Sequence, residues 1–381
     1  MDTIRLTEEL IKFRSISPSS EGSLEYLDKL LKSHNFECHL LEFGEQKVMN
    51  LYAVFKGGDG PNVCFAGHTD VVPPGDKDSW DSDPFTAVER DGRIYGRGAA
   101  DMKSAIAAYI SAVINFLKNK DSKFNGSISF LLTADEEGEA FFGTKKVVEW
   151  LEKKKIKLDF CLVGEPTNPN KLGEMIKIGR RGSMTGKLTI FGTQGHVAYP
   201  QRANNPSKII VEILKELKEI KFDKGTKNFQ PTNLEVTKIN MNNTADNIIP
   251  AMAEATFNIR FNNKHSSSSI KRRLNKIFKR LSEINRSKYK IEYKVSGEAF
   301  LTKPNKTTFM IQDIIKKITK IKPKLSTTGG TSDLRFIKKI SPGLEFGLVG
   351  KTMHKVDEAV SLRDLKDLTK IYQHILQNYF K

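Results

Sequence analysis

The sequence has no long hydrophobic run and few cysteine residues. No apolar stretch approaches the roughly 20 residues that a transmembrane helix needs. The N-terminal segment from Met1 to Leu6 predicts an amphipathic helix and lacks the uninterrupted apolar core of a signal peptide. The cysteines, Cys38, Cys64 and Cys161, are scattered and odd in number, which argues against a disulfide framework. We therefore expect a cytoplasmic protein that does not associate with membranes.

Nucleotide-binding and nucleic-acid-binding motifs are also absent from the sequence. The glycines at 96 and 98 follow only a short predicted strand and are not continued by Gly-x-x-Gly, which argues against a dinucleotide-binding loop. The net charge is +17, and residues 182–294 alone hold 21 Lys and Arg against 9 Asp and Glu. A solvated, lysine-rich surface explains this charge most simply, with steering of an acidic small substrate as the alternative. We expect no nucleic-acid partner.

The length of 381 residues predicts two domains or one domain with an insertion. Residues 1–181 and 295–381 alternate apolar strands with amphipathic helices, which predicts a discontinuous α/β catalytic domain. Residues 182–294 have a different pattern, with the order β-α-β-β-α-β of a ferredoxin-like fold. The predicted elements of this insertion are strands 183–191, 233–240, 254–261 and 289–295 and helices 206–220 and 267–283.

Three apolar strands of the first domain end in acidic or imidazole side chains. They are followed by His68 and Asp70 after strand 62–66, by Glu136 and Glu137 after strand 127–133, and by Glu165 after strand 159–163. Sites in open α/β sheets usually lie in the loops at one edge of the sheet. Taken singly, each residue has an ordinary alternative, such as a His–Asp pair that satisfies its own hydrogen bonds or a solvated acidic loop.

Asp101 and His354 extend this group of residues. Asp101 precedes helix 105–117, where a helix N-cap is the ordinary alternative. Two imidazoles and three carboxylates suit two zinc-like ions that share one aspartate. This set consists of His68, Asp101, Glu137, Glu165 and His354. Of the adjacent Glu136 and Glu137, one can bind metal while the other takes a proton from water, and the residues alone do not decide which.

Several motifs resemble the dinuclear zinc peptidase and deacylase family. They are residues 67–73 (GHTDVVP), 96–103 (GRGAADMK), 134–138 (ADEEG) and 164–167 (GEPT). The resemblance implies a zinc-peptidase-like catalytic domain with a mixed sheet and two Zn²⁺, with Co²⁺ as an alternative at one site. It implies His68 and Glu165 on one ion, Glu137 and His354 on the other, and Asp101 between them. It further implies that Asp70 orients His68, that Glu136 is the general base, and that a cis peptide follows Asp101.

Three more motifs resemble the family members that remove a succinyl group from diaminopimelate. They are residues 179–183 (GRRGS), 195–200 (GHVAYP) and 329–333 (GGTSD). The implied reaction is hydrolysis of N-succinyl-LL-2,6-diaminopimelate to succinate and LL-2,6-diaminopimelate, which serves lysine and peptidoglycan precursor synthesis. The resemblance also implies a homodimer through the inserted domain, in which His196 reaches the partner's site and helps to hold the oxyanion. The implied substrate-binding residues are Arg180, Ser183, Tyr199, Asn247, Arg260, Gly330 and Thr331.

One departure from the family pattern concerns Gly350. The family commonly has asparagine at this position, four residues before its last metal histidine, so the resemblance leaves fine substrate preference open. An N-acetylornithine deacetylase or an aminoacylase of the same family is the nearest alternative, and a dipeptidase side activity is a further one. A catalytically silent binding module would show a damaged metal set, whereas every implied ligand and Glu136 are present.

Overall fold

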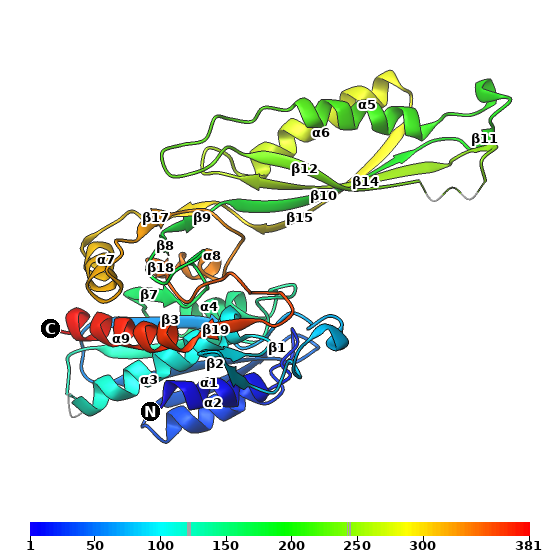
Figure 1. Cartoon of the computed structure of the whole chain (residues 1–381). Coiled ribbons are helices and arrows are strands. Elements are labelled where there is room, and N and C mark those ends of the chain that lie inside the picture. The colour runs from blue at the N-terminus through cyan, green and yellow to red at the C-terminus, as the bar shows by residue number, and fades with distance from the viewer. Residues whose placement is uncertain (120–122, 242, 244) are drawn as a thin grey trace. The chain divides into compact units, whose positions relative to one another are not determined.

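The computed structural model describes residues 1–119, 123–241, 243 and 245–381, and the chain divides into two compact units. The first unit comprises Met1–Ile178, Thr302–Ser326 and Ser332–Lys381. The second comprises Gly179–Leu301 and Thr327–Thr331. Within the described residues, we find no helix with both the length and the apolar character that a membrane span requires. Figure 1 labels the elements along the chain.

The first unit is built on an eight-stranded mixed sheet with the order β1-β2-β6-β3-β7-β18-β8-β17. The central strands β6, β3, β7 and β18 run parallel to one another, whereas β1 and β2 are antiparallel to their neighbours. In sheet order the strands are Glu37–Phe43, Val48–Lys56, Ser127–Thr133, Asn62–His68, Phe160–Val163, Gly343–Glu345, Met175–Lys177 and Lys324–Ser326. The central strands are buried over almost their whole length, as parallel strands covered on both faces must be.

Helices α1, α3 and α9 of this unit pack against one another (Figure 1). The middle of α3 is rich in alanine and almost fully buried, because small side chains let it approach its neighbours closely. Phe65 of β3 stacks on Tyr109 of α3 with ring centroids 4.2 Å apart, and Tyr372 of α9 meets the Phe65 ring edge-on at 5.8 Å. These contacts hold β3 in place at a point three residues before His68. The helices are α1 Thr3–Lys12, α2 Ser23–Lys32, α3 Ser104–Asn119, α4 Thr144–Lys153, α7 Lys306–Thr319, α8 Leu334–Ile337 and α9 Leu362–Tyr379.

A small three-stranded sheet joins distant parts of the first unit. Its order is β19-β5-β4, with β4 at Val88–Arg90, β5 at Arg93–Tyr95 and β19 at Ala359–Ser361. Pairing of β5 with β19 brings the glycine loop that follows β5 beside the segment that precedes β19. Short helical turns lie at Lys77–Ser79 and Ala99–Lys103.

The second unit contains a four-stranded antiparallel sheet of order β12-β14-β10-β15 and two helices. Along the chain its elements are β10 Gly182–Phe191, α5 Pro206–Glu219, β12 Asn233–Asn240, β14 Met252–Phe261, α6 Ser267–Ile284 and β15 Lys288–Gly297. Alternate residues of β10 and β14 point into one apolar core with the inner faces of both helices, including Leu188, Phe257 and Phe278. The predicted order of strands and helices in this part of the chain is confirmed.

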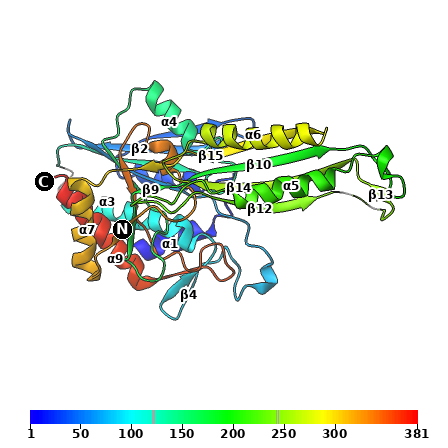
Figure 2. The same ribbon diagram turned by 90° about the horizontal axis from the view of Figure 1, so that it is seen from above.

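Two short ladders and a helical turn complete the second unit. Strand β9 (Gly179–Arg180) pairs with β16 (Phe300–Leu301), and β11 (Gly195–His196) pairs with β13 (Ile248–Ile249). The turn lies at Pro200–Arg202. Both views place the β11–β13 ladder at the opposite end of β10 from β9 (Figures 1 and 2).

Candidate metal centre

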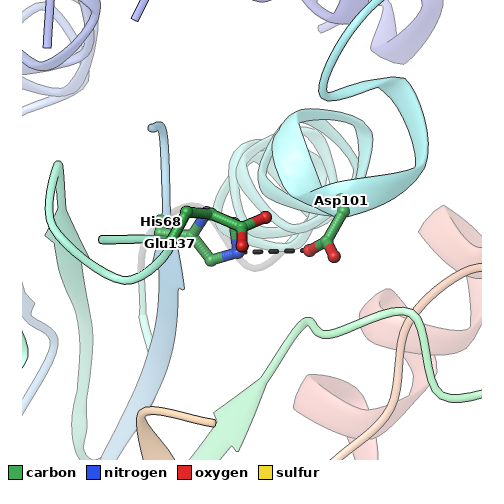
Figure 3. A group of neighbouring side chains, drawn as sticks. All are labelled: His68, Asp101 and Glu137. Carbon is green, nitrogen blue, oxygen red and sulfur yellow. Dashed lines mark hydrogen bonds and ion pairs between the residues drawn. The ribbon is translucent and has the colours of Figure 1, made fainter. Parts of the chain in front are cut away.

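Parallel pairing of β6, β3 and β7 brings their carboxyl ends to one edge of the sheet, as predicted. Candidate ligand atoms of His68, Asp101 and Glu137 lie within 4.8 Å of one another, and so do those of His68, Glu136 and Glu165. Figure 3 shows the first of these groups, with Asp101 directed at the imidazole of His68. The two groups share His68, so the predicted strand-end residues form one continuous cluster.

Asp101 lies between two imidazoles. Its Oδ1 is 3.2 Å from Nε2 of His68, and its Oδ2 is 3.3 Å from Nε2 of His354. The helix N-cap alternative for Asp101 is wrong, since both carboxylate oxygens face histidines. The peptide bond between Asp101 and Met102 is cis, as the family resemblance implied. Glu137 completes this side of the cluster, with Oε1 2.8 Å from Nε2 of His354.

The hydrogen bonds of His68 define which ring nitrogen faces the cluster. Its Nδ1 donates to the backbone carbonyl of Asp70 at 2.9 Å, so Nε2 is the ring atom that faces Asp101. Glu165 lies on the same side, with Oε1 3.9 Å from that Nε2. A metal-binding imidazole normally has its second nitrogen held in this way.

Asp70 holds the neighbouring turn with its side chain. Its carboxylate is 3.7 Å from Nδ1 of His68, which is too long for a hydrogen bond. The same carboxylate accepts from the backbone N–H groups of Glu136 at 3.1 Å and Glu137 at 3.0 Å. Asp70 therefore contacts His68 through its backbone and fixes the Glu136–Glu137 turn through its carboxylate.

A buried ion pair that we did not predict, Arg97–Glu358, lies behind the cluster. Arg97 Nη1 is 2.6 Å from Glu358 Oε2, and both side chains are almost completely buried. Glu358 Oε1 accepts from the backbone N–H groups of Ala100 and Asp101 at 2.8 and 3.0 Å. Arg97 Nη1 also donates to the carbonyl of Lys355 at 3.1 Å. This pair ties the Asp101 loop to the His354 loop.

A second group that we did not predict contacts Glu136. Arg335 Nη1 lies 3.3 Å from Glu136 Oε1, and the guanidinium is buried. Asp333 lies on the other side of Arg335 and accepts a hydrogen bond from Thr144 Oγ1 at 2.6 Å. Burial, followed by the nearby charge of Glu136, raises the pKa of Asp333 to about 7. The available sequence signal was one arginine within the otherwise apolar turn 334–337.

Electrostatics show that this cluster suits a divalent cation. Burial raises the pKa of Glu165 well above its usual range, and the charges of Asp101 and Glu136 add to that effect. Burial also raises the pKa of Glu137, against the opposing hydrogen bond from His354. Carboxylates packed this closely repel one another, and a cation between them relieves the repulsion. Mixed imidazole and carboxylate donors are the ligands of zinc and related ions.

Zinc binding is expected to release protons and to strengthen as pH rises. Hydrogen bonds with Asp101 and Glu137 raise the pKa of His354 to about 10, so this imidazole is protonated at pH 7 without metal. Zinc binds only the neutral ring, so binding must displace that proton. In the metal-free protein, the pairing of protonated His354 with Asp101 and Glu137 stabilises the fold. This contribution is complete below the ordinary histidine pKa of ~6.5, and it disappears as the pH rises toward 10.

Calorimetry in buffers of different ionisation enthalpy measures this release. We expect the measured heat of zinc binding at pH 7 to depend on the buffer. The control variant His374→Asn, which replaces a histidine of helix α9, should show the same dependence. A heat that does not depend on the buffer would contradict the prediction.

Five of the predicted substrate-binding residues lie near one end of the second unit's sheet. Arg180 Nη1 donates to the carbonyl of Thr328 at 3.2 Å, in the loop that continues to Gly330 and Thr331. Ser183 stands opposite Arg260 in the β10–β14 ladder. The Nε atom of Arg260 donates to Oδ1 of Asn258 at 3.0 Å.

His196, Tyr199 and Asn247 form a separate group at the other end of β10. The rings of His196 and Tyr199 have centroids 5.9 Å apart, and the N–H of Val197 donates to the carbonyl of Asn247 at 3.0 Å. Ser183 and Phe191 lie near opposite ends of β10, about 26 Å apart at roughly 3.3 Å per residue. Within one chain, the structure does not bring these three residues to Ser183 and Arg260.

Gly350 fits closely into its loop. A Cβ atom at this position would come within 3.0 Å of the carbonyl oxygen of Pro166 and 3.2 Å of Sδ of Met353. An asparagine here would therefore require its neighbours to shift.

The mixed sheet and the cluster of carboxylates and imidazoles at its edge are features of a metal-dependent hydrolase. The chain belongs to peptidase family M20/M25/M40, whose model matches residues 64–378. It is 67% identical to the succinyl-diaminopimelate desuccinylase of Pelagibacter ubique (strain HTCC1062), over 99% of this chain and 98% of that protein. It is 48% identical to the desuccinylase of the same name from Rickettsia felis, over 98% of both chains.

Solved structures share the fold at low sequence identity. The M20 family metallo-carboxypeptidase Sso-CP2 from Sulfolobus solfataricus matches with a TM-score of 0.81 at 19% identity, over 100% of this chain and 99% of that one. The Bacillus subtilis YXEP protein, described as a dinuclear metal binding peptidase, matches with a TM-score of 0.73 at 14% identity, over 100% and 98%. These matches support the fold alone.

Proposed function

We propose that this chain hydrolyses N-succinyl-LL-2,6-diaminopimelate to succinate and LL-2,6-diaminopimelate, in lysine and peptidoglycan precursor synthesis. The observation that carries the proposal is its 67% identity, over 99% of the chain, to a protein of that named activity. The complete cluster of His68, Asp101, Glu137, Glu165 and His354 at one sheet edge supports it. The three free cysteines agree with a cytoplasmic location, which is part of the same proposal.

Two Zn²⁺ ions, with Co²⁺ as an alternative at one site, are the proposed cofactors. His68 and Glu165 would hold one ion and Glu137 and His354 the other, with Asp101 shared. The Nε2 atoms of both histidines face Asp101, which supports this division. When bound, the ions would lower the pKa of a water molecule and polarise the amide carbonyl.

Glu136 is the proposed general base. It would take a proton from the attacking water and return that proton to the leaving amine, while the C–N bond of the succinyl amide breaks. The turn that carries Glu136 is held by Asp70, and one carboxylate oxygen is held by Arg335. A base fixed from two sides loses little entropy on reaching the transition state.

Substrate recognition is assigned to arginines because their planar forks match carboxylates. We propose that Arg180 and Arg260 bind the substrate's carboxylates, with Ser183, Gly330 and Thr331 as neighbouring contacts. The bond from Arg180 to Thr328 and the pairing of Ser183 with Arg260 support a single binding region in the second unit.

A homodimer through the second unit is part of the proposal. This ferredoxin-like unit, residues 182–294 in our assignment, would serve as a dimerisation and lid domain. Strand β12 is at one edge of its sheet, and its side chains Val236 and Ile239 are 36% and 54% exposed. Exposed apolar residues on an edge strand favour pairing with a second copy. The separation of His196, Tyr199 and Asn247 from Arg260 fits residues that act in the partner's site.

The variant Ile239→Lys is expected to be monomeric, because a lysine on an edge strand opposes strand pairing. Light scattering should give half the mass of the wild type, with an unchanged circular dichroism spectrum. The matched control is Val295→Lys, on the opposite edge strand β15, where Val295 is 37% exposed. The control should remain dimeric. Monomers from Val295→Lys and dimers from Ile239→Lys would contradict the proposed interface.

The deciding assay compares N-succinyl-diaminopimelate with N-acetylornithine as substrates of the zinc-loaded protein. We expect strong preference for the succinyl substrate and loss of that preference when Arg260 is replaced by alanine. Preference for N-acetylornithine would overturn the assignment in favour of the deacetylase alternative.

A further inference from the structure

We infer that Arg335 is a positioning residue that keeps Glu136 free as the base while the adjacent Glu137 faces the metal cluster. The inference rests on the proposed function, since it assigns Arg335 a role through Glu136. It answers a question that the sequence leaves open, namely what distinguishes two consecutive glutamates on one turn.

The contacts of the two glutamates differ. Glu137 Oε1 lies 2.8 Å from Nε2 of His354, within the cluster. Glu136 Oε1 lies 3.3 Å from Nη1 of Arg335. Yet Glu136 also offers an oxygen within 4.8 Å of ligand atoms of His68 and Glu165, so by position it could bind metal too. Pairing with a guanidinium engages one carboxylate oxygen and partly neutralises its charge, which weakens it as a metal ligand.

Arg335 is poorly placed to serve stability alone. Its side chain is 7% exposed, and its Nε has no hydrogen-bond partner in the part of the chain that the structure describes. The nearest oxygen of Asp333 is 4.0 Å from Nη2, which is beyond hydrogen-bonding distance. A buried charge with so few partners is often less stabilising than an apolar residue of similar volume. The contact with Glu136 is therefore the best account of the arginine.

The surroundings of Arg335 hold its guanidinium in one orientation. The Cζ atom of Arg335 lies 4.5 Å from the centroid of the Phe336 ring, so this ring packs against the guanidinium. The carboxyl group of Asp333 lies 4.0 Å from Nη2 of Arg335 and is itself fixed by Thr144, the first residue of α4. A side chain constrained by its neighbours can hold a catalytic group to within a fraction of an ångström.

The experiment is a double-mutant cycle on the zinc-loaded enzyme with N-succinyl-diaminopimelate. Arg335→Met is made in the wild type and in Glu136→Asp, and kcat, KM and zinc content are measured for each. In the wild type we expect kcat to fall about 10- to 100-fold with two zinc ions retained and KM nearly unchanged. In Glu136→Asp we expect a much smaller further loss, because the two residues act as a unit. Arg335→Lys should restore part of kcat.

The matched control is Arg363→Met, an arginine 90% exposed on α9, which should leave kcat unchanged. Equal losses from Arg335→Met in both backgrounds would indicate a structural role and overturn the inference, as would a fully active Arg335→Met. If Arg335→Met does not fold, the same cycle with Arg335→Lys decides. Turnover of Glu136→Gln within tenfold of the wild type would instead contradict the assignment of the base, so the two failures are distinguishable.

Discussion

The variant Glu136→Gln is expected to lose about 10⁴-fold in kcat while it retains both metal ions. Glutamine has nearly the same shape but cannot accept a proton, and positioned general acid–base groups contribute up to about 10⁴-fold. The loss should be at the high end because the same carboxylate is proposed to serve twice, first as base and then as acid. Glu136 makes no hydrogen bond to His68 or His354 among the contacts of the described residues, so metal binding should survive.

Two measurements check this prediction: kcat on N-succinyl-diaminopimelate and zinc content by elemental analysis. The control is Glu139→Gln, which alters an exposed carboxylate three residues further along the same loop. The control should keep full activity. Turnover of Glu136→Gln within tenfold of the wild type would mean that another group acts as the base.

The second large effect is expected from Asp101→Asn. An amide offers one oxygen and one N–H₂ group, so it cannot present an acceptor to both sides as the carboxylate does. Because Asp101 faces His68 with one oxygen and His354 with the other, at least one metal position should be lost. We expect kcat to fall by about 10³-fold or more, since a shared ligand supports both ions.

Competition with a zinc chelator measures the accompanying loss of affinity. We expect fewer than two zinc ions per chain in Asp101→Asn at a chelator concentration that leaves the wild type fully loaded. Asp313→Asn, an exposed position on α7, provides the control and should bind two. Two tightly bound ions in Asp101→Asn would contradict the shared position of Asp101.

Much of the cluster could be predicted because strand direction constrains side chains strongly. The apolar runs before His68, Glu136 and Glu165 are too short and too buried for anything but central strands. Once the runs are parallel neighbours, their ends must meet at one edge. The order of elements in the second unit was predictable from periodicity, since buried residues alternate strictly along β14 and recur every three to four residues along α6.

The supporting contacts could not be predicted, because they depend on packing between segments far apart in the sequence. Arg97 and Glu358 are 261 residues apart and meet only because β5 pairs with β19. Arg335 reaches Glu136 over 199 residues, and no local pattern encodes that distance. For Asp70, a carboxylate two residues from a histidine suggested a direct side-chain contact. The backbone carbonyl takes that place in the structure, and the carboxylate turns to the N–H groups of residues 136 and 137.

The Arg97–Glu358 pair also has a consequence for how the protein is made. During synthesis from the N-terminus, Arg97 and Asp101 leave the ribosome long before Glu358 and His354 exist. Until then, a guanidinium that is 2% exposed in the finished protein has no carboxylate to neutralise it. The loop that carries Asp101 therefore gains its buried ion pair only after the second unit has been translated. His354 is translated in the same late stretch, so the cluster has all five of its residues only when the last part of the chain has been made.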